Sequence, residues 1–171
     1  MSDWRSMSPE EGQRALEAHL EKTLRENNVD QKDTLNGMMK CAGSGCSFAD
    51  RTMTFRFPIQ SWQVNRVGDL HGGMICTAFD VVISALARFF AGENFAPTVS
   101  LEVKYVRPAK VGDELVVTAK ATSTGRRVSQ LTGEARSAAT GKLIATAAAI
   151  HLNVDTDKEH REAAAGAEEH K

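Results

Sequence analysis

The longest apolar stretch of the chain, Met74–Phe90, has a pattern that predicts a buried helix. Apolar residues fall on nearly every side of a helical wheel, which is typical of a helix inside a protein core. The stretch is slightly short for a membrane span and carries Asp80 at its centre and Arg88 near its end. A carboxylate at mid-bilayer costs about 2.5–3.5 kcal/mol even on a lenient scale. We therefore interpret residues 73–91 as a core helix and expect no membrane insertion.

Four strands are predicted after this helix from the alternation of apolar and polar residues. They cover Thr98–Val106, Leu115–Thr122, Val128–Ala138 and Lys142–Asn153. Because short, turn-rich segments separate them, we expect an antiparallel meander. A helix that is apolar on all sides needs cover on all sides, which a curled sheet provides. The predicted fold class is α+β.

Upstream of the long helix, local signals predict a helix and a strand. Ser8-Pro9-Glu10-Glu11 combines an N-cap, a proline at the first helical position and an acidic residue three positions after the cap. We expect this amphipathic helix to end near Asn27-Asn28. Met53–Phe57 alternates like a strand and is closed by Pro58. We interpret Gly43-Ser44-Gly45 as a turn.

Composition and charge narrow the class of protein. A chain of 171 residues is long enough for one domain with a full core. The net charge of −1 gives no signal for a nucleic-acid partner or an anionic membrane. The first residues lack the apolar run of a secretory signal and include acidic side chains, unlike a transit peptide. We expect a cytoplasmic protein, with the mitochondrial matrix as the alternative.

The three cysteines, Cys41, Cys46 and Cys76, form an odd set without a CxxC pair. This pattern fits free thiols in a reducing compartment. We interpret Cys76 as a small core residue because it lies in the apolar helix. We expect no metal site, no cofactor and no chemistry at the cysteines.

The polar, glycine-rich segment that leads into the long helix is the first candidate for chemistry. Gly72 and Gly73 leave backbone N–H groups approachable at a helix start, where partial positive charge can stabilise a developing oxyanion. The alternative is a turn packed closely on a neighbouring strand. The neighbouring His71 either caps the helix by bonding the backbone or acts as a positioning group or general base.

Asp80 is the one carboxylate in the apolar helix. A buried, unpaired carboxylate is costly, so it needs a partner, a pKa shift or a chemical role. One interpretation is a hydrogen bond to Thr77 or Ser84 of the same helix. The other is a general base or nucleophile that acts on a thioester. Together with oxyanion donors, Asp80 indicates hydrolysis of an acyl compound. Ser84 has no evident base and no GxSxG motif, so a serine hydrolase is disfavoured.

Weaker candidates lie on both sides of the helix. Asn65 is in a loop, where asparagine often serves turn chemistry alone. Thr98 opens a predicted strand after Pro97. Arg107 and Lys110 flank a proline in a predicted exposed turn, where they would either contact the phosphates of a nucleotide-bearing carrier or serve as solvated surface charge.

The pattern of these residues resembles the hotdog-fold acyl-CoA thioesterases, of the phenylacetate-pathway and human thioesterase-superfamily-member type. The motif that carries the resemblance is Asn65-x5-His71-Gly72-Gly73-x6-Asp80, followed by Thr98-Val99-x7-Arg107-Pro108-Ala109. It implies a curled antiparallel sheet wrapped around one long central helix. The resemblance covers a hotdog domain at roughly 35–153. An N-terminal helical extension at 1–34 lies outside it, as does the tail at 154–171, whose polar, Ala-rich composition predicts disorder or a loose helix.

The resemblance also implies roles for the motif residues. The Gly72 amide would meet the thioester oxygen, with His71 and Asn65 positioning the group. Asp80 would be the base or nucleophile, and Thr98 would orient a water or the carboxylate. The implied reaction converts acyl-CoA to a free acid and CoA, in fatty acid metabolism. A hotdog-fold enoyl hydratase or dehydratase and a non-catalytic acyl-CoA-binding module remain alternatives, although the helix carboxylate favours an enzyme. The acyl group, and CoA against acyl carrier protein as the thiol carrier, stay open.

The spacing of Gly72 and Asp80 predicts an active site shared between subunits. Eight residues of helix separate the two groups by about 12 Å along the axis. A thioester carbonyl must lie about 3 Å from both its attacking group and its oxyanion donor. One helix therefore cannot supply both groups, whereas a second copy related by two-fold symmetry can. The resemblance implies the same assembly, a homodimer or a dimer-of-dimers homotetramer.

Overall fold

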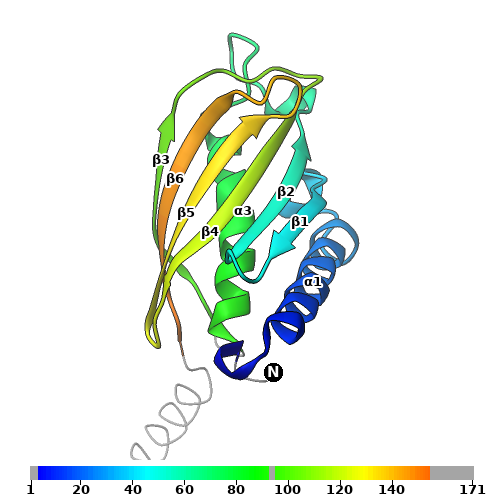
Figure 1. Cartoon of the computed structure of the whole chain (residues 1–171). Coiled ribbons are helices and arrows are strands. Elements are labelled where there is room, and N and C mark those ends of the chain that lie inside the picture. Colours follow the sequence, from blue (N-terminus) through cyan, green and yellow to red (C-terminus); the bar gives the residue numbers. More distant parts are fainter. Residues whose placement is uncertain (1–3, 93–94, 155–171) are drawn as a thin grey trace, which may run out of the picture.

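A long helix, α3 (Gly72–Ala91), lies against one face of a curled, six-stranded antiparallel sheet (Figure 1). The structure is a computed structural model that describes residues 4–92 and 95–154. The strands are β1 (Ala42–Ser47), β2 (Thr52–Pro58), β3 (Thr98–Tyr105), β4 (Glu114–Thr124), β5 (Val128–Ser137) and β6 (Leu143–Leu152). The predicted helix and strands are present, with ends that differ by a few residues. The predicted disordered tail lies outside the described residues from position 155 on.

The strand order is β1-β2-β4-β5-β6-β3, which corrects the predicted meander at one connection. β4, β5 and β6 follow one another as neighbours, but β3 pairs with β6 and lies at the edge opposite β1 (Figure 1). The chain then crosses one end of the sheet to reach β4. The backbone N–H groups of Val106 and Arg107 both donate to Ile144 O, which holds the start of this crossing beside β6. Leu70 N–H donates to Ala109 O and ties the crossing to the loop before α3.

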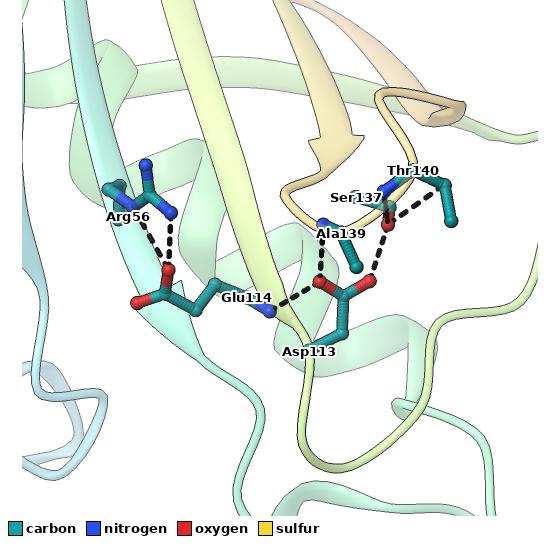
Figure 2. Close-up of polar contacts among 6 residues, drawn as sticks. All are labelled: Arg56, Asp113, Glu114, Ser137, Ala139 and Thr140. Carbon is teal, nitrogen blue, oxygen red and sulfur yellow. Dashed lines mark hydrogen bonds and ion pairs between the residues drawn. The ribbon is translucent and has the colours of Figure 1, made fainter.

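The end of the crossing is anchored by Asp113 (Figure 2). Its carboxylate accepts hydrogen bonds from Ser137 Oγ at 2.5 Å and from the backbone N–H groups of Ala139 and Glu114 at 3.0 and 2.8 Å. Partial burial acts to raise the pKa of Asp113, but these hydrogen bonds outweigh it and lower the pKa. Beside it, the Arg56 guanidinium donates to the Glu114 carboxylate across β2 and β4. The crossing therefore joins the sheet at a fixed point.

α3 is not apolar on all sides, contrary to the sequence prediction. Most of its residues are buried in the core, but one stripe along the helix is not buried. The stripe contains Gly73, Thr77, Asp80, Ser84 and Arg88, at spacings of three or four residues. By length and composition α3 could cross a membrane, yet 67% of its most apolar 18-residue segment is buried inside this structure. The sheet and α1 together thus cover most of α3 and leave the stripe uncovered in the single chain.

The N-terminal helix α1 (Pro9–Arg25) begins with the capping box that the sequence predicts. Ser8 Oγ accepts from Glu11 N–H, and the Glu11 carboxylate accepts from Ser8 N–H. Leu16 and Leu20 of α1 are buried in the core shared with α3, and α1 lies along β1 (Figure 1). The π-helical segment η2 (Glu26–Asp30) follows directly. The remaining short elements are η1 (Trp4–Ser6), α2 (Leu35–Met38) and η3 (Ser61–Gln63).

Gly43 and Gly45 lie inside strand β1, so the turn predicted for Gly43-Ser44-Gly45 is wrong. The pairing with β2 shifts register between them, and Gly45 has a φ of +137° that side-chain-bearing residues rarely adopt. A Cβ at Gly43 would lie 2.8 Å from Leu24 Cδ1. The glycines therefore permit a bulged edge strand in close contact with α1, a feature whose composition resembles that of a turn.

Candidate active site

Asp80 lies on the uncovered stripe of α3, at the side of a hollow of about 240 Å³. Thr98 Oγ1 donates to Asp80 Oδ1 at 2.9 Å, and Ser84 Oγ lies 3.4 Å from Thr98 Oγ1. The partner of Asp80 is therefore a residue of β3, and not Thr77 or Ser84 of its own helix, because Thr77 Oγ1 donates to the backbone oxygen of Gly73. The predicted burial of the carboxylate is corrected, since Asp80 is exposed in the single chain.

The segment before β3 is held so that Thr98 meets Asp80. Leu152 N–H donates to Pro97 O at 3.1 Å, and Val154 N–H donates to Phe95 O at 2.8 Å. The buried imidazole of His151 binds Ala96 O through Nδ1 at 3.0 Å. Three successive residues before Thr98 are thus bonded to the last residues of β6 or to Val154 just after it. The Thr98 hydroxyl consequently occupies a defined position beside the carboxylate.

Gly72 borders a different hollow, of about 340 Å³, which is lined by Asn65, Asp69, Leu70, Gly72, Ile75, Tyr105, Val106, Arg107 and Pro108. Gly72 is the first residue of α3, so its N–H has no partner within the helix. No other group in residues 4–92 and 95–154 accepts a hydrogen bond from it. The N–H of Gly73, by contrast, donates to His71 Nδ1 at 2.9 Å. Of the two glycine amides, only that of Gly72 is available to a ligand.

His71 is the N-cap of α3 and makes the local backbone contact that the capping interpretation predicts. Asn65 likewise makes turn contacts, because its Oδ1 accepts from Val67 N–H at 3.0 Å and from Asp69 N–H at 3.1 Å. These bonds orient the Asn65 amide and leave its Nδ2 without an acceptor in the described part of the chain. Asn65 lines the Gly72 hollow, whereas His71 is exposed and does not line it.

The two cationic candidates, Arg107 and Lys110, differ in their contacts. Arg107 lines the Gly72 hollow and donates through Nη1 to Leu143 O at 3.0 Å. Lys110 forms an ion pair with Asp69, which also lines that hollow. Both cationic side chains are exposed, so a ligand in the Gly72 hollow has access to positive charge at its edge.

Tyr105 is a site residue that the sequence reasoning placed only in the strand pattern. Its hydroxyl donates to Gly72 O at 3.0 Å, and its ring would lie 3.2 Å from a Cβ added at Gly72. Burial of the hydroxyl, and then the neighbouring Cys76, raise the pKa of Tyr105, so the group remains a donor. The available signal was that the chain's single tyrosine stands directly before the turn that contains Arg107.

Metal and thiol chemistry find little support in the described residues. Residues 4–92 and 95–154 contain no group of three or more His, Cys, Asp or Glu side chains that could hold a metal ion. Burial raises the pKa of all three thiols, which lowers their reactivity at neutral pH. Cys76 is half-buried, so its interpretation as a core residue is corrected, while Cys41 is buried.

Asp80 and Gly72 therefore border separate hollows of one chain. The eight residues between them correspond to about 12 Å along the helix axis. One hollow contains a carboxylate oriented by a hydroxyl, and the other contains a free backbone N–H and one exposed cation, Arg107. Each hollow has one half of what the attack of a nucleophile on an acyl carbonyl requires.

Known proteins share both the sequence pattern and the fold. A profile of the thioesterase superfamily matches residues 67–153, just over half of the chain. Acyl-coenzyme A thioesterase 13 of Mus musculus is 34% identical over 101 residues, which are 58% of this chain and 71% of that protein.

Two solved structures extend the likeness to three dimensions. A phenylacetic acid degradation-related protein of Ralstonia eutropha JMP134 superposes with a TM-score of 0.68 at 25% identity, over 78% of this chain and 98% of that one. Thioesterase superfamily member 2 of Mus musculus superposes with a TM-score of 0.66 at 20% identity, over 80% and 96% of the two chains. These likenesses confirm the hotdog fold and the α+β class. The chain belongs to the thioesterase superfamily.

Proposed function

We propose that this protein hydrolyses acyl-CoA thioesters to a free acid and CoA, in a site built from two copies of the chain. The observation that carries the proposal is the separation of Asp80 and Gly72 into two hollows, one with a proton acceptor and one with a free oxyanion donor. The names of the relatives support the substrate class, because the mouse relative is an acyl-coenzyme A thioesterase.

In the proposed reaction the thioester oxygen accepts a hydrogen bond from the Gly72 N–H. This donor stabilises the negative charge that develops on the oxygen, helped by the partial positive charge of the helix start. Thr98 donates to Asp80 Oδ1, which leaves Asp80 Oδ2 as the oxygen for the reaction. As a base, Asp80 takes a proton from the attacking water, and the departing CoA thiolate then takes that proton. As a nucleophile, the Asp80 carboxylate would displace the CoA thiolate and form a mixed anhydride, which water would hydrolyse to the free acid and the regenerated carboxylate.

The other candidates support the two main groups in this scheme. His71 occupies the N–H of Gly73 and thereby leaves that of Gly72 as the donor for the substrate. The free Asn65 Nδ2 can donate to the same thioester group. Arg107 and Lys110, at the edge of the Gly72 hollow, meet the phosphates of CoA. The CoA part thus lies on the Gly72 side, and the acyl part lies on the Asp80 side.

The proposed assembly brings Asp80 of one copy to Gly72 of the other. The uncovered stripe of α3 is a surface that a second copy would cover. β3 is an edge strand of the sheet and exposes Val99 and Tyr105, which are 61% and 56% accessible. Exposed apolar residues on an unpaired strand edge favour pairing with another chain. A homodimer, or a dimer of such dimers, would cover both the stripe of α3 and the edge of β3.

The direct test is to incubate the protein with a panel of acyl-CoA thioesters and a thiol reagent. We expect release of free CoA, because hydrolysis sets the thiol free. A change in enoyl absorbance without thiol release would indicate a hydratase instead. Binding of the thioesters without any turnover would indicate a binding module. Either of these two results would contradict the proposed hydrolysis.

A further inference from the structure

The Asp80 hollow continues along α3 to a second charged group, Arg88. Asp80, Ser84 and Arg88 follow one another at spacings of four residues, so they share one face of the helix. Arg88 lies about 12 Å beyond Asp80 along the axis, and its side chain tilts back toward the start of the helix. In the thioesterase proposed above, the acyl part occupies this hollow. The far end of an acyl chain of medium length would therefore meet Arg88.

The guanidinium of Arg88 has unused hydrogen-bonding capacity. Its Nε atom is buried and has no acceptor in the described part of the chain. Its one ion-pair contact there joins Nη1 to Glu26 Oε2 at 3.7 Å, which is longer than a hydrogen bond. A guanidinium offers five N–H donors in a planar fork that matches a carboxylate. A buried donor without an acceptor is unfavourable, so a ligand that accepts from it gains affinity.

The surroundings of Arg88 can accommodate a second carboxylate. Glu26 is the nearest protein anion, but it also lies 3.6 Å from Lys22 Nζ. If a ligand carboxylate takes Arg88, Glu26 therefore keeps a cationic partner. Three residues with amide side chains also line the hollow: Asn27 and Gln31 of the N-terminal extension, and Asn36 of α2. Polar walls around an arginine suit an acyl group with a polar end better than one with a methyl end.

We propose that the protein selects acyl groups of medium length that end in a carboxylate, and that Arg88 is the residue that binds this carboxylate. The inference rests on the proposed function only for the position of the thioester. Arg88 also stands in the last turn of α3, where a cation complements the helix dipole. That structural role predicts no discrimination between acyl groups, so the two roles can be separated by experiment.

The experiment compares adipoyl-CoA with hexanoyl-CoA, two thioesters of equal chain length that differ in a terminal carboxylate against a methyl group. We expect a higher kcat/KM for adipoyl-CoA. Arg88→Gln should lower the ratio of the two values by at least about tenfold, mainly through KM, because it removes a charge-assisted, bidentate contact. Glu26→Gln should raise the ratio, since it removes the competing carboxylate. Arg25→Gln removes an exposed guanidinium that does not line the hollow, and the ratio should stay unchanged.

Equal rates for the two thioesters in the wild-type protein, or an unchanged ratio in a folded Arg88→Gln variant, would overturn the proposal. Calorimetric binding of both thioesters to the Asp80→Asn protein, with and without Arg88→Gln, separates this result from failure of the proposed function. If no thioester is hydrolysed but adipoyl-CoA binds more tightly through Arg88, the selectivity stands and the hydrolase assignment fails. If hydrolysis proceeds without preference, the selectivity alone fails. Thermal unfolding checks the fold of each variant.

Discussion

The Asp80 hollow and the Gly72 hollow lie on the same helix but have opposite chemistry. The first contains a carboxylate with two hydroxyl neighbours, Ser84 and Thr98, and so accepts protons. The second contains the free N–H of Gly72, the free Nδ2 of Asn65 and the cation Arg107, while its one anion, Asp69, is paired with Lys110, so it can stabilise negative charge. A reaction at an acyl carbonyl needs both properties within a few ångströms. This difference is the basis of our proposal that one chain holds two half-sites.

A further difference concerns the parts of the chain that build the two hollows. The Asp80 hollow is lined in part by residues of η2, in the N-terminal extension, and of α2, which directly follows the extension. The Gly72 hollow is lined only by the loop before α3, α3 itself, the end of β3 and the crossing to β4. Substitutions in the N-terminal extension should therefore alter the Asp80 hollow, where we propose that the acyl group binds. They should leave the oxyanion donor at Gly72 unchanged.

The largest effect is expected from Asp80→Asn, which removes the proton acceptor from the first hollow. We expect kcat to fall by about 10²–10⁴-fold, because an amide cannot act as a general base. The fold should survive, since Asp80 is exposed and Asn still accepts from Thr98 Oγ1. Asp33→Asn, at an exposed position of the extension, is the matched control and should keep its activity. Steady-state kinetics give the answer: retention of more than about a tenth of wild-type kcat would refute the role of Asp80.

The next effect is expected from removal of the Gly72 N–H in the second hollow. Gly72→Pro deletes this donor at the first helical position, where proline is well tolerated, and His71 has φ −62° and ψ 135°, which suit a residue before proline. We expect kcat/KM to fall by about 10²–10³-fold. Gly72→Ala keeps the N–H and only adds a Cβ in close contact with the Tyr105 ring, so the fall in kcat/KM should be smaller. Equal losses in the two variants would show that the N–H carries no part of the catalysis.

A smaller effect is expected from Thr98→Val, which keeps the shape but removes the hydroxyl that orients Asp80. The lost hydrogen bond to a charged group corresponds to about 1.5–3 kcal/mol, or roughly tenfold or more in kcat. KM should change little if Thr98 acts on the carboxylate and not on the substrate. Thr98→Ser retains a hydroxyl and should restore most of kcat. A loss that appears only in KM, or that serine fails to restore, would contradict this positioning role.

The smallest effect is expected from acidification at His19, which packs α1 on α3. Burial lowers the pKa of His19 below its ordinary value, although the hydrogen bond to Ala85 O acts against the shift. The unfolded chain therefore binds a proton at about pH 6.5, before the folded chain does. The contribution to stability is complete above that pH and is lost as pH falls toward the folded-state pKa, with a slope of at most about 1.4 kcal/mol per pH unit.

Urea unfolding across this pH range should show that slope in the wild-type protein and a smaller slope in His19→Gln. Hydrogen exchange should locate the loosening in α1 and leave the loop before α3 unchanged. Identical slopes in the two proteins would show that other groups account for the pH dependence. Faster exchange in the loop before α3 would break the proposed independence of the two hollows.

Local signals in the sequence were sufficient for the two long helices, α1 and α3, and for most strands, but not for the short helix α2. The capping box at Ser8 and the apolar run of α3 depend on residues close in the chain, so a single sequence contains the information. The position of β3 does not, because strand order depends on pairing between distant segments. The uncovered stripe of α3 was readable from the spacing of Thr77, Asp80 and Ser84, but the high apolar content of the helix obscured it.

The candidate site likewise contains features that the sequence predicts and features that depend on contacts between distant segments. Asp80, Gly72 and His71 form a local motif around one helix start, so their spacing could be read from the chain. The contact of Tyr105 with Gly72, and the wall that Asn27 contributes beside Asp80, join segments far apart in the sequence. No periodicity or turn signal reports such contacts, because they arise only when the sheet has folded around the helix.

The most direct test of the two half-sites is to mix Asp80→Asn protein with Gly72→Pro protein under conditions that allow subunit exchange. In a mixed dimer one site collects both defects, and the other site collects neither. We predict that activity rises far above that of either parent, toward about half of the wild-type activity in each mixed dimer. If mass spectrometry shows that mixed dimers form and activity stays at the level of the parents, then Asp80 and Gly72 do not act across a subunit boundary.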